Sequence, residues 1–121
     1  MHLRKNNKPK PRLPTVQEIL GYRPKRLDFE WSENVEALVE IKVPKFTSNF
    51  GKSFCKIIRK DDVFTAKMDK IGTVVWKNCD GNNSVKDILK ILKKEFPKEE
   101  NIDNRLFLFL QQMHALNYIE W

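Results

Sequence analysis

The spacing of apolar residues is mainly that of strands before residue 69 and that of helices after it, and this change limits the fold. Before it, apolar and polar residues alternate, as is typical of half-buried strands. The alternating segments are residues 27–31, 38–45 and 63–69. After it, apolar residues recur every three or four positions, as on one face of a helix. We therefore predict an α+β domain, winged-helix-like, with a three-stranded antiparallel sheet followed by a three-helix bundle.

One segment interrupts this order between the second and third strands. Within residues 46–60, the apolar positions Phe46, Phe50, Phe54 and Ile57 recur at helical spacing. The basic residues of the segment face away from these positions, so the pattern is that of a short amphipathic helix or a helical loop; they are Lys52, Lys56, Arg59 and Lys60. We expect a helical insert at about 46–60.

The first helix after the sheet is expected over residues 70–79. It ends at Asp80-Gly81, because glycine tolerates the left-handed conformation that helix ends favour. Trp76 within this helix is interpreted as a buried anchor that holds the helix on the sheet. Asp80-Gly81 is interpreted as a turn and not as a metal or acid–base site.

Two further helices follow. Ser84 and Asp87 have the spacing of a capping box, and Pro97 ends the helix that they begin. Asp103 is the expected cap of the last helix. The final residues, 118–121, form a short strand or simply cover the core.

The positive charge of the chain is concentrated near its start. The net charge is +7, and residues 1–26 hold eight Lys/Arg against one acid, Glu18, whereas the rest sums to zero. Such Pro-rich basic segments are usually solvated. We expect residues 1–26 to be a mostly flexible tail, or a docking arm for an acidic partner, and residues 27–121 to be the folded domain. Within the tail, residues 15–22 have the cap and stop signals of one or two helical turns.

The sequence carries no catalytic pattern that we recognise. His2 lies in the tail and His114 has no partner at helical spacing, and the cysteines Cys55 and Cys79 lack paired metal spacing. We therefore predict no enzyme activity, no metal and no cofactor. No apolar run reaches the ~18 residues that span a bilayer, and no secretory leader is evident. We expect a cytoplasmic protein that does not bind membranes.

Two stretches together resemble a known family. "KMDKIGTVVWKNCDGNNSVKDILKILKKEF", followed by "LFLFLQQMHALNYI", is similar to the PqqD family, which includes the pyrroloquinoline quinone biosynthesis chaperone and the recognition elements of ribosomally made, modified peptides. The resemblance covers residues 64–119. The longer connection at 46–60 and the basic tail depart from the family pattern, which marks a divergent member. The positions that carry the resemblance are Trp76, Asp80, Gly81, Ser84, Val85 and Ile88.

The resemblance implies a non-catalytic peptide-binding module. In the family, the leader segment of a precursor peptide adds as a strand to the free edge of the three-stranded sheet, lies against the last helix, and is presented to a modifying enzyme, often a radical S-adenosylmethionine (SAM) enzyme. Strand addition satisfies unpaired backbone groups at such an edge. The resemblance implies that residues 27–121 form a PqqD-like winged-helix domain and that residues 63–69 are its edge strand. The expected peptide-binding residues are Val63, Thr65, Ala66, Lys67, Phe107, Leu108 and Gln111.

Other functions stay open from the sequence. A winged helix can bind nucleic acid or act as a regulator, but the neutral charge of the body and a last helix with only Arg105 as a basic residue within 103–118 make nucleic acid an unfavoured partner. A structural subunit of a larger enzyme complex is a further alternative. The free sheet edge also allows a homodimer.

Overall fold

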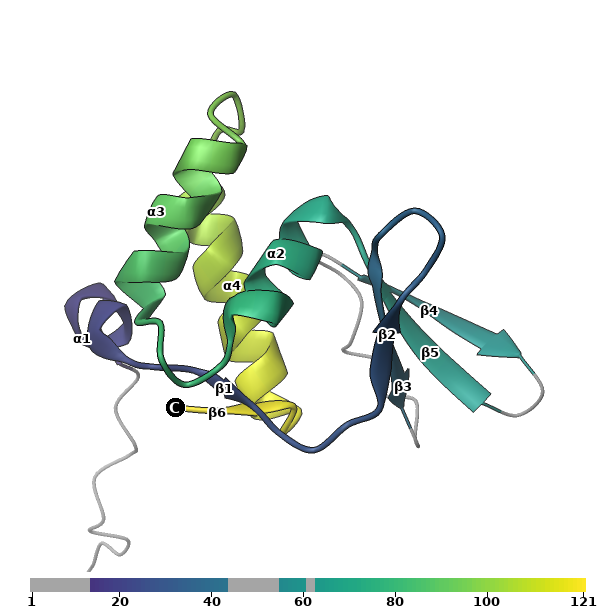
Figure 1. Cartoon of the computed structure of the whole chain (residues 1–121). Helices are drawn as coiled ribbons and strands as arrows, with labels where there is room; N and C mark the ends of the chain where they lie inside the picture. The colour runs from purple at the N-terminus through teal and green to yellow at the C-terminus, as the bar shows by residue number, and fades with distance from the viewer. Residues whose placement is uncertain (1–13, 44–54, 61–62) are drawn as a thin grey trace, which may run out of the picture.

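The computed structural model describes residues 14–43, 55–60 and 63–121 of the chain. Residues 1–13, most of the expected insert (46–54) and residues 61–62 lie outside the described part. A four-stranded sheet stands beside a group of helices, and residues 25–26 pair with residues 119–120 in a second, two-stranded sheet (Figure 1). The elements are α1 (Val16–Gly21), β1 (Lys25–Arg26), β2 (Trp31–Glu33), β3 (Val39–Val43), β4 (Cys55–Lys60), β5 (Val63–Met68), α2 (Lys70–Asn78), α3 (Val85–Glu95), α4 (Ile102–Ala115) and β6 (Ile119–Glu120).

The α+β class is confirmed, with an antiparallel sheet followed by helices. The larger sheet has the order β2-β3-β5-β4, and every pair is antiparallel. The predicted hairpin exists, but its first strand begins at Trp31 instead of residue 27. The reason is that the preceding backbone pairs elsewhere: β1 joins β6, and the Leu27 N–H donates to the Tyr118 carbonyl at 2.9 Å.

The prediction of a helical insert at 46–60 is wrong for residues 55–60, the part of this segment that the structure describes. Residues 55–60 form β4, which pairs with β5 from Cys55↔Met68 to Lys60↔Val63. The open side of β5 offers these residues a complete ladder of backbone partners, which outweighs a weak helical spacing. The prediction that residues 63–69 form a free edge strand is therefore also wrong, because β5 lies between β3 and β4.

The helix boundaries follow the capping signals, with one exception. The capping box of Ser84 and Asp87 is present at the start of α3 as predicted. Asp69 caps α2 by accepting a 2.8 Å hydrogen bond from the Gly72 N–H. The expected Asp103 cap of α4 is wrong: Asn101 occupies the cap position in a left-handed conformation, with φ of 58° and no side-chain cap bond.

The core lies between the sheet and the helices, and Trp76 sits inside it. Trp76 is fully buried and meets Trp31 edge-on, with ring centroids 6.4 Å apart, so its role as an anchor is confirmed. Its indole Nε1 has no hydrogen-bond partner among the described residues. The other large side chains at the centre of the core are Phe109, Ile41, Met68, Ile88, Leu92, Leu106, Leu110, Met113, Ile119 and Val39.

Residues 14–26 are part of the folded body, which corrects the prediction of a mostly flexible tail for this stretch. Thr15 and Glu18 form a capping box that starts α1. Ile19 is buried, and α1 packs against α3. The Val85 N–H donates to the Tyr22 carbonyl at 2.8 Å, which fixes the end of α1 beside the start of α3.

Candidate functional site

The hydrogen-bonding phase of the large sheet can be read from one bond. The Lys42 N–H donates to the Glu30 carbonyl at 2.9 Å, so Lys42 directs its backbone groups toward β2. Because the two sides of an antiparallel strand alternate residue by residue, its neighbour Ile41 bonds toward β5. Ile41 pairs with Ala66. Ala66 therefore directs its N–H and C=O toward β3.

The same alternation assigns the other side of β5. Val63, Thr65 and Lys67 direct their backbone groups away from β3, and their partners on β4 are Lys60, Ile58 and Lys56. Four residues of this strand were expected to bind a peptide, and these three direct their backbone groups to the side away from β3. Their groups face β4 instead of open solvent.

Ala66 does not share this position. Its backbone belongs to the β3–β5 ladder, and its side chain is buried in the core. The contact of Ala66 with a peptide stays a prediction, and its backbone groups do not face the outer side of β5. A change there would alter the sheet itself and not its edge.

Two of the three predicted residues on α4 are exposed. Leu108 is 48% exposed, one of few large apolar side chains exposed to this degree among the described residues. Gln111, one turn further, is also exposed, whereas Phe107 is half-buried and packs on the core. The principal neighbours of α4 are α3 and β6, whereas those of β5 are β3, β4 and α2. The two sets of predicted residues thus lie on elements with different principal neighbours.

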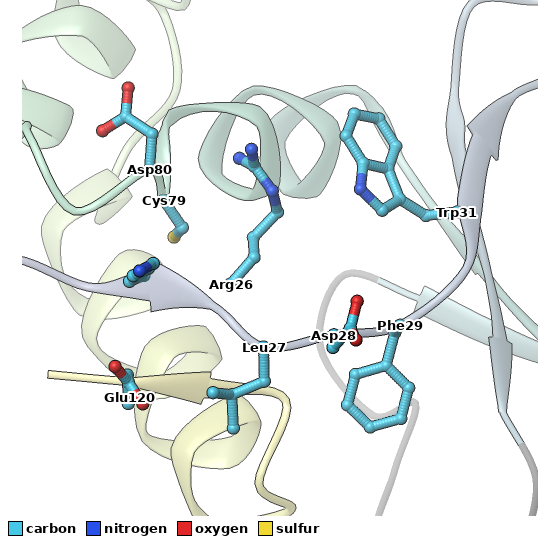
Figure 2. Close-up of a pocket in the computed structure, with 9 residues that line it drawn as sticks. Arg26, Leu27, Asp28, Phe29, Trp31, Cys79, Asp80 and Glu120 are labelled. Carbon is cyan, nitrogen blue, oxygen red and sulfur yellow. The ribbon is translucent and has the colours of Figure 1, made fainter.

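A hollow of about 480 Å³ opens between the N-terminal segment and the end of α2 (Figure 2). Arg26 projects across it and donates from Nη1 to the carbonyls of Trp76 at 2.9 Å and Lys77 at 3.0 Å. Its guanidinium also lies 5.3 Å from the centre of the Trp31 ring. Sequence reasoning missed this residue, because Arg26 entered it only as one charge of the tail.

Two further side chains that line the hollow, those of Cys79 and Asp80, have shifted pKa values. Burial raises the pKa of the Cys79 thiol to about 12, so this thiol stays protonated and is a poor nucleophile. Backbone N–H bonds, that of Asn82 above all, lower the pKa of Asp80. No cluster of three or more metal-binding side chains occurs in the part of the chain that the structure describes.

Asp80-Gly81 is the turn that the sequence predicted. The Asp80 carboxylate accepts a 2.8 Å bond from the Asn82 N–H, and Gly81 has a φ of 83°, which favours glycine. The Gly81 N–H donates to the Pro24 carbonyl at 2.9 Å, and the backbones of Asp80 and Lys25 form an isolated antiparallel β-bridge. The turn therefore also holds the N-terminal segment in place.

Two strands form the edges of the described sheet. On β2, the alternation directs the backbone groups of Trp31 and Glu33 outward; on β4, it directs those of Cys55, Ile57 and Arg59 outward. The β4 edge is the longer one, with six residues against three. Within the described residues, no helix is long and apolar enough to cross a membrane.

Comparison with protein families gives one result. Residues 62–119, just under half of the chain, match the family model described as Coenzyme PQQ synthesis protein D (PqqD). The match begins just before β5 and ends at β6, so β2, β3 and β4 lie outside it. Comparisons with curated proteins and with solved structures returned no match.

Proposed function

Because residues 62–119 form a PqqD-like domain, we propose that this chain is a non-catalytic recognition element for a ribosomally made precursor peptide. It captures the leader segment of the precursor by strand addition and presents it to a modifying enzyme of the radical SAM type. The supports are the family match and the sheet geometry described above.

The orientation of the β5 backbone groups is the main support for this proposal. Val63, Thr65 and Lys67 all direct their backbone groups to the side of β5 opposite β3, where the family's added strand lies. A row of backbone donors and acceptors binds an extended peptide with little demand on its sequence, and side-chain contacts then supply selectivity. Leu108 on α4 is an exposed apolar side chain suited to such a contact.

The test uses synthetic leader peptides encoded by short reading frames beside the gene for this chain. Each is titrated into the ¹⁵N-labelled full chain by NMR. We expect the largest amide shifts at Thr65 and Lys67, and a loss of affinity of about 3–10-fold for Leu108→Ser, in line with about 1 kcal/mol for a partly buried apolar contact.

The chain provides a matched control. Val16 on α1 is as exposed as Leu108, at 53% against 48%, but belongs to a different face of the fold. Val16→Ser should leave the affinity unchanged. If no neighbouring leader peptide shifts the β5 amides, or if both serine variants bind as tightly as the wild type, the proposed site is refuted.

Nucleic-acid binding is the competing function, favoured by the net charge of +7. The two functions respond differently to salt. Phosphate contacts made by several Lys/Arg lose affinity steeply between 50 and 200 mM salt, whereas a backbone ladder depends weakly on it. A 20-base-pair duplex that binds more tightly than any leader peptide, with a steep salt slope, would support the nucleic-acid function.

A further inference from the structure

The strand β4 occupies the side of β5 on which a peptide would add. Its six residues cover the whole of β5, from Cys55↔Met68 to Lys60↔Val63. It also lies outside the segment that matches the family. We propose that β4 is a built-in occupant of the peptide position, and that a leader peptide pairs with β5 only after β4 has left it. This inference rests on the proposed function and adds its regulation.

The register makes the two occupants mutually exclusive. The outward groups of Val63, Thr65 and Lys67 face Lys60, Ile58 and Lys56, so a second strand cannot use them at the same time. A peptide that takes the place of β4 runs antiparallel to β5 as β4 does. The alternative is addition outside β4, where other residues, such as Ile57, direct their groups outward.

The fold does not need β4 to hold β5 in place. On its other side β5 pairs with β3, and Ala66 and Met68 are buried in the core. Among the described residues the principal neighbour of β4 is β5, and Figure 1 shows β4 at the outer margin of the sheet, away from α3 and α4. Release of β4 therefore leaves the sheet β2-β3-β5 and its helices intact.

Hydrogen exchange tests the release of β4 without any ligand. In the native full chain, the amides of Thr65 and Lys67 face β4, whereas those of Phe64 and Ala66 face β3. Local opening of an edge strand frees only the first pair. We expect Thr65 and Lys67 to exchange at least ~100-fold faster than Phe64 and Ala66. Equal rates for the alternating amides would overturn the proposal, whether or not a peptide binds.

Two proline variants one residue apart test whether a peptide can replace β4 on β5. Ile58 directs its N–H toward β5 and Ile57 directs its N–H outward, and proline is tolerated in an edge strand only where the N–H is unpaired. The probe is a synthetic peptide of residues 53–62 with Cys55 replaced by serine. It should bind Ile58→Pro at least ~10-fold more tightly than it binds the wild type or Ile57→Pro. Equal affinities for all three proteins would refute the replacement of β4 by a peptide.

The leader peptides separate this inference from the proposed function. If a leader binds the wild type but Ile57→Pro weakens it and Ile58→Pro does not strengthen it, the peptide adds outside β4; the proposed function then stands and the inference fails. If the exchange rates and the β4 peptide behave as expected but no leader binds, the inference stands and the proposed function fails.

Discussion

Arg26 should be one of the most costly side chains to remove outside the core. Its guanidinium donates to two carbonyls at the end of α2, those of Trp76 and Lys77, and it lies over the ring of Trp31. Arg26→Ala deletes all three interactions while leaving the backbone pairing of β1 in place.

The magnitude follows from these contacts. The bond to the Trp76 carbonyl is partly buried and comes from a charged donor, which contributes about 1.5 kcal/mol. The exposed bond to Lys77 adds little, the cation over the ring about 0.5–1 kcal/mol, and the positive charge at a helix end about 0.3–1 kcal/mol. The expected loss is about 2.3–3.5 kcal/mol, or roughly 7–21 °C in Tm for a domain of this size.

The assay is thermal unfolding of the full chain, followed by circular dichroism. Lys25→Ala is the matched control, because Lys25 is exposed and adjacent in the same strand; its Tm should change by less than about 3 °C. Arg26→Lys should fall between the two, because a lysine keeps the charge but not the planar donor group. A Tm of Arg26→Ala within about 2 °C of the wild type would refute the role assigned to this side chain.

Other predictions concern the core, α1 and pH. Trp76→Ala should cost about 3–5 kcal/mol in denaturant unfolding; a fully stable variant would contradict the anchoring role. Ile19→Ala should cost about 2–3 kcal/mol but the exposed Val16→Ala under about 0.5 kcal/mol; equal effects would mean that α1 does not pack on α3. The folded-state pKa of Asp80 lies below its ordinary value of 3.8, so its stabilisation is present above that pH and lost below it. Asp80→Asn should therefore lower Tm at pH 7, and the difference from the wild type should shrink as the pH falls below 3.8; a Tm difference that does not change with pH would contradict this.

The helical half of the fold was predictable because its signals are local. The capping box of Ser84 and Asp87 lies within one turn, and the turn at Asp80-Gly81 requires a single backbone conformation that glycine supplies. Trp76 lies beside the apolar face of its own helix, and it belongs to the short motif that carries the family resemblance. Each of these features depends on residues a few positions apart, so it can be predicted from a short stretch of one sequence.

The features that the sequence did not predict depend on distant partners. The spacing within residues 55–60 fits a helix in isolation, but β5 provides a strand partner for every one of these residues. Arg26 gained its role from the α2 carbonyls about fifty positions away. The candidate site divides in the same way: a strand at residues 63–69 could be predicted, whereas its register and the presence of β4 beside it could not.

The pairing of β1 with β6 also has a consequence for the order of folding. Lys25 lies opposite Glu120, so this two-residue ladder closes a loop of about 95 residues. The entropic cost of that closure is about 4 kcal/mol from the length-dependent part alone, more than two residue pairs recover. We expect the ladder to form only after α2, α3 and α4 have assembled between its strands, so that substitutions at Arg26 accelerate unfolding and leave the folding rate unchanged. A slower folding rate in Arg26→Ala would instead place this junction in the folding nucleus.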